Sequence, residues 1–385
     1  MNEIYFDADI LAIRESVRQF RDKHVAPLVE DCDANERFPI ELLEPLLEAG
    51  ILRMPLPQEY GGMDANCQTL SVVIEEISVA MPALGSVLLS CFSPMRIVGA
   101  VAKPHQREAF HRLITSKPMV LAFCLSEPEV GSDARAMHTR AHRRGGGWVL
   151  NGRKRWISSA TVSGCYLVFA RTGAGREDIS CFVVPGDAKG LSFGKPERKM
   201  GFRAQVLADV VFDEVEIADD CLIGNVGEGW RALTMVANTM RCWGAAAIAT
   251  GLARAALDAA TLYANQREAF GRKIGKFQGV SFKLADMAIA LRQSQLLLRD
   301  TNWRVDNELP DVSARTQAQV SMAKCHAADA AMRVTTEAVQ ILGGCGYMRE
   351  YQVERMMRDA KAIQIFDGSN EIQRVIIGKY LLDTS

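Results

Sequence analysis

Residues 148 to 158 read "WVLNGRKRWIS" and place Asn151-Gly152 between apolar flanks. An Asn-Gly pair in this setting is a strong signal for a two-residue β-hairpin turn. The short β-rich runs "YLVFAR", "ISCFVVP" and "ADVVFDEVEI" follow and are separated by turns. We therefore expect residues 119 to 220 to be mostly strand.

Helical patterns flank this region on both sides. Before it, apolar residues recur at helical spacing, as in Ile10, Ile13, Val17 and Phe20. After it, from about residue 230, the chain is rich in Ala and Leu, and the small residues of "GAAAIATGLARAALDAA" would let helices approach closely. Strands and helices do not alternate, which excludes a doubly wound sheet. We expect a mainly α protein with an inserted β domain, in which the two helical parts can share one core.

The length of 385 residues suggests two or three packing units. We place them at residues 1–118 (helical), 119–229 (β) and 230–385 (a helical bundle). The chain has 45 basic and 46 acidic residues, so it lacks the positive footprint of a nucleic-acid binder. No apolar run reaches the roughly 18 residues of a membrane span, and the N-terminus reads as an amphipathic helix rather than a targeting peptide. These features predict a cytoplasmic protein without a membrane span.

The ten cysteines are scattered singly, without CxxC spacing or a neighbouring histidine pair. Reduced, buried thiols are therefore favoured over a zinc site or a disulfide framework, and we expect no metal. None of the six histidines stands in a recognisable catalytic spacing.

Two polar segments of the β region could carry chemistry. In "LAFCLSEPEVGSDARAMHTRA", residues 121 to 141, hydroxyls and backbone donors can converge around Pro128 and Gly131, although a polar turn is the alternative. In "RKRWISSA", residues 153 to 160, Trp156 and Ser158 on one strand face could stack on a planar ring and hydrogen-bond its heteroatoms. A buried core Trp is an equally good reading.

Two further segments lie in the second helical part. In "YANQREAFGRKIGKFQGV", residues 263 to 280, Arg267 offers a planar fork for a diphosphate, or simply a basic helix end. In "AVQILGGCGYMREYQVERMMRDAK", residues 338 to 361, three glycines end a helix or admit a cofactor. The chain has no P-loop, no GxSxG and no HExxH, which leaves phosphoryl transfer, α/β-hydrolase and zincin chemistry without support.

Taken in order, "SEPEVGSD", "RKRWIS", "QREAFGRKIGKFQ", "QILGGCGY" and "RDAKAIQIFDGSNEIQR" closely resemble the signature segments of the acyl-CoA dehydrogenase family of flavoenzymes. The resemblance runs from about residue 6 to residue 382. It implies an N-terminal helical domain, a central β-barrel-like domain and a C-terminal four-helix bundle. It also implies FAD at the subunit contacts of a homotetramer.

The resemblance implies roles for individual positions. The isoalloxazine would be lined by Phe123, Leu125, Ser126, Trp156 and Ser158. The FAD diphosphate and adenosine would be held by Arg267, Phe270 and Gln278, together with Gln340, Gly343 and Gly344 from a neighbouring subunit. Ser369 and Glu371 would lie beside the flavin, and Ser132, Arg241 and Gly368 would contact substrate, with Ser132 near the pantetheine arm.

Within "IFDGSNEIQ", residues 365 to 373, Asp367 stands where most relatives carry the Glu that removes the α-proton of a thioester while the β-hydrogen leaves as hydride to flavin N5. Asp367 is therefore the candidate base. It is shorter by one methylene, and a misplacement near 1 Å can cost about a hundredfold in rate. Two explanations are open. The substrate lies closer to Asp367, as a branched, cyclic or polar acyl chain would, or Asp367 has a role other than that of the usual base.

Some relatives place the base on the bundle helix instead. The matching position here is Arg241, followed by Cys242 where many relatives have Arg, so the alternative base is absent and the usual handle contacts are changed. We keep both CoA and acyl carrier protein as handles.

The resemblance implies α,β-dehydrogenation of an acyl thioester, with an electron-transfer flavoprotein or a similar acceptor reoxidising the flavin. A same-fold oxygenase, reductase or elimination catalyst, or a catalytically silent FAD-binding subunit, remain alternatives, because a fold does not fix a reaction.

Overall fold

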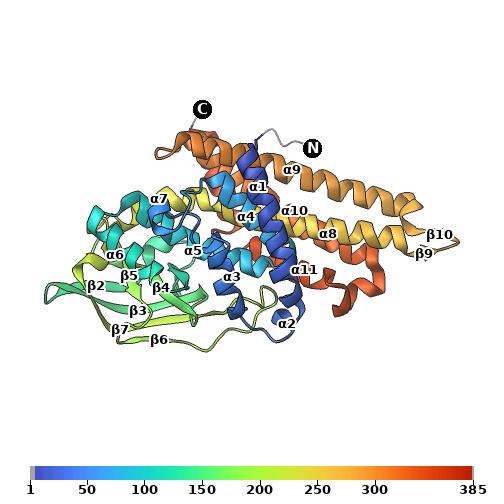
Figure 1. Ribbon diagram of the computed structural model, residues 1–385. Helices are drawn as coiled ribbons and strands as arrows, with labels where there is room; N and C mark the ends of the chain where they lie inside the picture. The colour runs from blue at the N-terminus through green and yellow to red at the C-terminus, as the bar shows by residue number, and fades with distance from the viewer. Residues whose placement is uncertain (1–4, 384–385) are drawn as a thin grey trace.

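The computed structural model describes residues 5–383, and its elements follow the expected order of helices, strands and helices (Figure 1). The first helices are α1 (Ala8–Phe20), α2 (Val29–Ala34), α3 (Leu43–Glu48), α4 (Cys67–Ala80), α5 (Pro82–Val101) and α6 (Pro104–Thr115). The predicted apolar face of α1 is confirmed, since Ile10, Val17 and Phe20 are buried. The side chain of Asp7 caps this helix by accepting from the Ile10 N–H at 2.8 Å.

The middle of the chain forms one sheet, as its alternating and β-branched runs predict. Its strands are β1 (Val120–Cys124), β2 (Arg140–Arg144), β3 (Gly147–Ser158), β4 (Ser163–Arg171), β5 (Ile179–Pro185), β6 (Leu191–Phe193), β7 (Leu207–Ile217) and β8 (Leu222–Ile223). They are ordered β6-β7-β3-β2-β4-β5-β8, and β1 pairs in parallel with β4. The predicted domain boundaries at 118/119 and 229/230 remain a prediction.

The hairpin prediction at Asn151-Gly152 is wrong, because both residues lie inside β3. The turn falls six residues earlier, at Gly145-Gly146, where both φ angles are positive (+58° and +83°) as a two-residue hairpin loop requires. Gly152 instead serves a close approach of strands: a Cβ there would lie 2.6 to 2.8 Å from atoms of Thr139.

A second departure from the expected strand lies at Trp156. Between Lys154 and Ile157, β3 carries one more residue than β7, and Trp156 in this bulge has a φ of +56°. The bulge shifts the alternation of side chains before Ile157, which is buried between the exposed Trp156 and the half-buried Ser158, and the shared face of Trp156 and Ser158 remains a prediction. The bulge leaves Trp156 52% exposed rather than buried as a core residue.

The second helical part contains α7 (Gly229–Met240), a π-helical turn (Arg241–Ala246), α8 (Ala247–Gln266), α9 (Gln278–Glu308), α10 (Ala314–Leu342), α11 (Val353–Ile363) and α12 (Asn370–Asp383). A small hairpin, β9 (Glu268–Ala269) and β10 (Arg272–Lys273), joins α8 to α9. The close helix approach expected from small residues is confirmed at Gly251, where a Cβ would lie 2.3 Å from the Glu75 carbonyl oxygen of α4. Helices α4 and α8 therefore pack almost backbone to backbone.

The two helical parts share one core, as predicted. A single cluster of buried side chains runs from Val17 in α1 through Ile74 in α4 and Leu121 in β1 to Ala331 in α10. A second cluster fills the other face of the sheet. The helical parts thus enclose one face of the inserted β domain.

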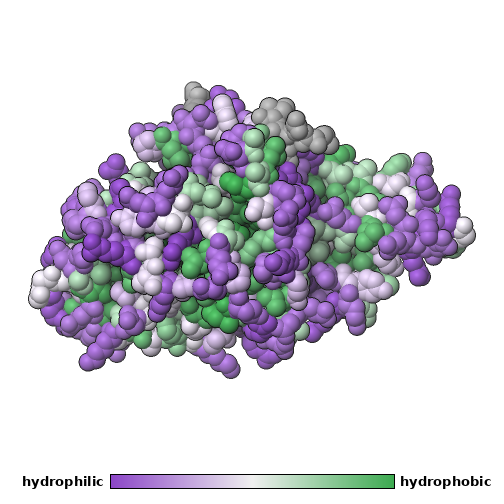
Figure 2. Space-filling model, viewed as in Figure 1, coloured by the Kyte–Doolittle hydropathy of each residue, from purple (hydrophilic) through white to green (hydrophobic). Residues whose placement is uncertain are grey.

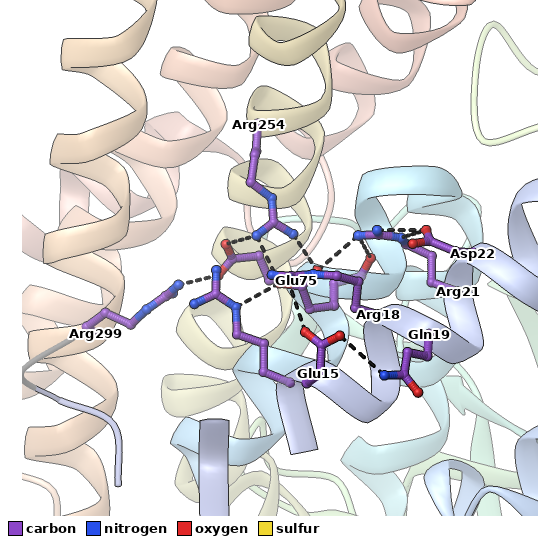
Figure 3. A network of polar contacts seen from close by, with 10 residues as sticks. Glu15, Arg18, Gln19, Arg21, Asp22, Glu75, Arg254 and Arg299 are labelled. Carbon is purple, nitrogen blue, oxygen red and sulfur yellow. Dashed lines mark hydrogen bonds and ion pairs between the residues drawn. The ribbon is translucent and has the colours of Figure 1, made fainter. Parts of the chain in front are cut away.

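Buried ion pairs also join the two helical parts. Glu76 of α4, 1% exposed, pairs with Arg14 and Arg21 from the N-terminal helical segment at 2.9 Å each, and with Arg254 of α8 at 2.8 Å. Figure 3 shows Arg254 and Arg299 reaching the neighbouring Glu75 from the bundle side, at 3.7 and 2.7 Å. Buried carboxylates need such partners, because an unpaired buried charge is costly.

Two helical segments, Pro82–Val101 and Gly229–Gln266, are long and apolar enough to cross a membrane by length and composition alone. Most of each apolar window, 72% and 67%, is buried inside the protein. Helices at the centre of a large core have the same composition, so this is weak support for a span.

Candidate active site

Asp367 and Gly368 lie in the bend that joins α11 to α12. Both have positive φ, +55° and +84°, a conformation that a non-glycine residue seldom adopts. Side chains from three other places hold this backbone. Arg241 Nε donates to the Asp367 carbonyl at 2.9 Å, and Lys324 Nζ and Gln373 Nε2 each donate to the Gly368 carbonyl at 2.9 Å. A Cβ at position 368 would lie 2.7 Å from Gln373 Nε2, so the bend requires glycine there.

The carboxyl group of Asp367 has no partner within the described part of the chain. The residue as a whole is half-buried, but its Oδ2 atom is inaccessible and accepts no hydrogen bond. Burial raises the pKa of Asp367 to about 6, while the nearby cations Lys324 and Arg241 oppose that rise. Such a carboxylate is mostly ionised at neutral pH and is still basic enough to take a proton.

Lys324 of α10 is fully buried beneath the bend. Besides the Gly368 carbonyl, its Nζ contacts Asn370 Oδ1 at 3.0 Å. Burial lowers the pKa of Lys324 to about 8, against the effect of Asp367. Asn370 in turn donates to Asp329 at 2.7 Å, and Asp329 pairs with Arg374 at 2.8 Å. A continuous polar network therefore supports the bend from the protein surface inward.

The residues expected beside the isoalloxazine come from the ends of β1 and β3. The Ser126 carbonyl accepts the Arg155 N–H at 2.8 Å, which brings Leu125-Ser126 beside the bulge that carries Trp156. Phe123 packs against Phe169 with ring centroids 5.5 Å apart. The structure thus groups these positions at one end of the sheet, with Trp156 open to solvent.

A separate cavity of about 370 Å³ lies where α8 and α10 end. It is lined by Arg267, Gly343 and Gly344, together with Tyr263, Ile274, Ile341, Leu342 and Cys345 of the same chain. A Cβ added at either glycine would meet no atom within 4 Å, so the backbone there is open to a ligand. Arg267 is exposed and lies where the end of α8 leads into the β9–β10 hairpin.

Three further predicted positions near this cavity do not line it. Phe270, at the tip of the hairpin with a φ of +51°, is 95% exposed and packs edge-on against Phe277. Gln278 and Gln340 are exposed. Figure 1 places β9–β10 at the opposite end of the molecule from the sheet, so one chain does not bring the two groups of predicted flavin contacts together.

The remaining predicted positions lie at the surface or next to the bend. Ser132 is exposed beside Asp133, which pairs with Arg176 at 2.5 Å. Ser369 follows Gly368 and its Oγ accepts the Ile372 N–H at 3.4 Å at the start of α12. Glu371 is exposed, and its pKa is lowered by its own backbone N–H and by Ser369.

Comparisons with known proteins agree with the order of helical, β and helical domains. Three family models match in order: the acyl-CoA dehydrogenase N-terminal domain at residues 7–117, the middle domain at 122–215 and the C-terminal domain at 227–382. The chain belongs to the acyl-CoA dehydrogenase family. It is an oxidoreductase of the acyl-CoA dehydrogenase type, and the expected fold of helical, β and helical domains is confirmed.

Individual relatives of this acyl-CoA dehydrogenase family member span almost its whole length. A 3-(aryl)acrylate reductase of Clostridium sporogenes is 34% identical, over 98% of this chain and 100% of the relative. The butyryl-CoA dehydrogenase of Megasphaera elsdenii is 32% identical with a TM-score of 0.93, covering 99% and 100%. A glutaryl-CoA dehydrogenase of Mycobacterium smegmatis, solved in complex with FADH2, is 28% identical with a TM-score of 0.91, covering 98% and 96%.

Sequence reasoning missed a buried pair behind the isoalloxazine positions. Lys154, fully buried, donates to the Leu125 carbonyl at 3.0 Å and to Glu127 at 2.8 Å. Glu127 also accepts the N–H groups of His138 and Thr139. Burial would raise the pKa of Glu127, but these donors hold it below its ordinary value. The signal available in the sequence was one charged residue in each of two polar segments: Glu127 in residues 121 to 141 and Lys154 in residues 153 to 160.

Lys324 was missed as well. It is the one charged side chain in the small-residue run "SMAKCHAADAAM", residues 321 to 332, that is fully buried among the described residues. A lone lysine on the inner face of an Ala-rich helix was the signal, but its partner lies 44 residues away, in the Asp367 bend.

Proposed function

We propose that this acyl-CoA dehydrogenase family member introduces an α,β double bond into an acyl thioester, with Asp367 as the base that removes the α-proton. The observation that carries this proposal is the buried, unpartnered Oδ2 atom of Asp367 on a backbone held by three side chains. A general base works best when its pKa lies near the operating pH and when no protein group competes for its lone pair in the free enzyme. Asp367 meets these conditions.

The backbone of Asp367 suits the second task of the site, which is to stabilise the negative charge that develops on the thioester oxygen. Among the described residues, the Asp367 N–H has no acceptor. Pre-oriented N–H donors are effective for such a charge because they do not reorganise during the reaction. We assign this N–H to the thioester carbonyl, as in the resemblance described above.

The residues present fit FAD. The exposed Trp156 offers a flat apolar surface, and the cavity at Arg267 offers a guanidinium and open glycine backbone for a diphosphate. Bound FAD would supply the acceptor for the β-hydrogen as hydride. We assign the isoalloxazine contacts to Phe123, Leu125, Ser126, Trp156 and Ser158, with Ser369 and Glu371 nearby.

The wide separation of Trp156 from the Arg267 cavity within one chain supports an oligomer in which two chains complete each site. An apolar stripe on α9 offers a surface for such contacts: Phe282, Ile289, Leu296 and Trp303 recur every seven residues and are 45 to 62% exposed. Apolar residues interrupt the hydrophilic face in Figure 2 where Figure 1 places α9. We propose a homotetramer, the state that the family resemblance implies, with an electron-transfer flavoprotein or a similar acceptor.

A reductase running the same step backwards is the second candidate. The observation in its favour is the 34% identity to a 3-(aryl)acrylate reductase over the full length of that relative. In that direction protonated Asp367 would deliver the proton to the α-carbon, and the same contacts to the bend would be used.

An anaerobic titration of the purified holoprotein with acyl thioesters, on CoA and on carrier protein, tests the proposal. Straight, branched and cyclic acyl groups are compared by the loss of the flavin absorption band. Dehydrogenation predicts bleaching by at least one class, and Asp367→Asn should abolish it while FAD stays bound. Bleaching of Asp367→Asn at the original rate would refute the base assignment. A dithionite-reduced enzyme that reoxidises with enoyl thioesters but never bleaches with saturated ones would favour the reductase.

Asp367→Glu is the sharper probe of the short base. The longer side chain restores the reach that most relatives have, so a gain with straight-chain thioesters would support a substrate that sits closer to Asp367. Equal losses with every acyl class would instead indicate that the longer carboxylate no longer fits the bend.

A further inference from the structure

The charges around the bend do not cancel. Arg241 and Lys324 are the two cations that act on the Asp367 carboxylate. Neither forms an ion pair with it in the described residues, and both donate instead to backbone carbonyls. Asp329, further along the network, already pairs with Arg374. With Asp367 ionised, the site therefore holds one positive charge in excess.

Arg241 has the largest unused hydrogen-bonding capacity of these groups. Its guanidinium carries five N–H donors. Nε donates to the Asp367 carbonyl, Nη1 makes one long contact to Asn238 Oδ1 at 3.4 Å, and Nη2 donates to no group in the described part of the chain. Arg241 is half-buried, and this burial lowers the pKa of its guanidinium. A substrate bound here would displace water from the guanidinium, and free donors that lose water are costly unless the substrate itself accepts from them.

The position of Arg241 places these free donors against the Asp367-Gly368 backbone. A Cβ at Gly368 would lie 3.5 Å from both Nε and Nη2, so the guanidinium lies flat against the Asp367-Gly368 backbone. Arg241 also acts electrostatically on the Asp367 carboxylate, so a substrate whose α-carbon reaches that carboxylate lies near the guanidinium. A wholly apolar acyl chain would leave both the excess charge and the free donors without a partner.

We propose that Arg241 binds a carboxylate carried by the acyl group, so that the substrates are monothioesters of dicarboxylic acids. This inference rests on the proposed thioester chemistry at Asp367. A carboxylate matches the fork of Nη1 and Nη2 and neutralises the excess charge. A carboxylate site also explains why this chain has Arg241 where some relatives place their base on the bundle helix. Arg241 would select the acyl group, and Asp367 would carry out the proton transfer.

Arg241 also holds the Asp367 carbonyl in place, but it uses only Nε for that contact. A test must therefore separate positioning of the bend from recognition of the acyl group. Two matched series of CoA thioesters do so: succinyl, glutaryl and adipyl against butyryl, pentanoyl and hexanoyl, which have the same carbon numbers and lack the second carboxylate.

The experiment measures kcat/KM for anaerobic flavin bleaching by both series, and equilibrium binding of both series to the holo form of Asp367→Asn. The wild-type enzyme should prefer the carboxylate of each pair by about 10- to 100-fold, the range of a charged hydrogen bond, mainly through KM. Arg241→Gln should remove that preference, and Arg241→Lys should retain part of it because the charge stays and the fork is lost. Arg231→Gln, which removes an exposed charge from the neighbouring α7, should keep the preference.

An equal or greater kcat/KM for the apolar series in the wild-type enzyme would overturn the inference, whether or not Arg241→Gln folds. So would a preference for the carboxylates that Arg241→Gln leaves intact. If no member of either series bleaches the flavin, the dehydrogenation proposal fails, and the binding measurement still decides between a carboxylate site and an apolar one.

Discussion

Replacing the Asp367 carboxylate with a neutral isostere should stabilise the protein while abolishing its chemistry. Burial moves the pKa of Asp367 from an ordinary 3.8 to about 6 in the folded protein. A tenfold change in proton affinity corresponds to about 1.4 kcal/mol, so ionising this group costs the folded state about 3 kcal/mol. The folded state binds the proton more tightly, so this cost is present in full above pH 6 and disappears below the unfolded value near pH 4.

Asp367→Asn removes that cost because the amide does not ionise. We expect the variant to be more stable than the wild type by up to about 3 kcal/mol at pH 7.5, with the difference shrinking towards zero near pH 4. Urea unfolding followed by circular dichroism measures it, at fixed protein and FAD concentration, because bound ligand and subunit contacts shift apparent stability. Asp311→Asn is the control: it removes an exposed carboxylate and should change stability by less than about 0.5 kcal/mol.

The pH dependence separates this explanation from a simple packing gain. A variant that is equally stabilised at pH 4.5 and 7.5 would owe its stability to something other than the charge. A variant less stable than the wild type at pH 7.5 would mean that the carboxylate has a favourable partner, and the reasoning about an unpaired Asp367 would be refuted.

Three other outcomes follow from the same structure. The kcat/KM for flavin bleaching should fall about tenfold per pH unit below pH 6 and level off above it, because the proposed mechanism requires ionised Asp367; a flat profile from pH 5 to 8 would contradict this. Arg267→Ala should weaken FAD binding about 10- to 100-fold, measured by flavin retention on gel filtration, and full occupancy would exclude the diphosphate contact. Lys154→Met should destabilise folding by about 3–5 kcal/mol because Glu127 is left buried and unpaired, with partial recovery on adding Glu127→Gln, whereas an unchanged urea midpoint would show that Lys154 is not needed.

The order of domains could be predicted from the sequence because it depends on local periodicity. The apolar spacing of α1 and the β-branched runs of β4, β5 and β7 each specify their structure within a few residues. Local sequence alone could not show that the predicted turn at Asn151-Gly152 is wrong. Whether that pair turns or continues a strand is decided by Thr139 packed against Gly152, and by the stronger Gly145-Gly146 turn.

Part of the candidate site could be predicted from the sequence, because one of its segments resembles a family signature rather than because of local periodicity. Asp367 was identified because its segment resembles a family signature, but nothing local to that segment shows that its carboxyl lacks a partner. Arg241 and Lys324 reach the bend from positions 126 and 44 residues away along the chain. Contacts at such separations arise only after the bundle has packed, so the electrostatics around Asp367 could not be predicted from the sequence.

The arrangement of the two cations has a chemical consequence for Asp367 in its proposed role as base. Had Arg241 or Lys324 paired directly with Asp367, the pKa of the carboxyl would have fallen, typically by about 1–3, and the group would have become a poor acceptor for an α-proton. Both side chains instead donate to the carbonyls of Asp367 and Gly368. The positive charge remains close enough to stabilise a developing anion, while the carboxylate stays basic. The two carbonyls face the cations at a bend with positive φ, so in the proposed mechanism the strained backbone at Asp367 is part of how this acid is kept available as a base.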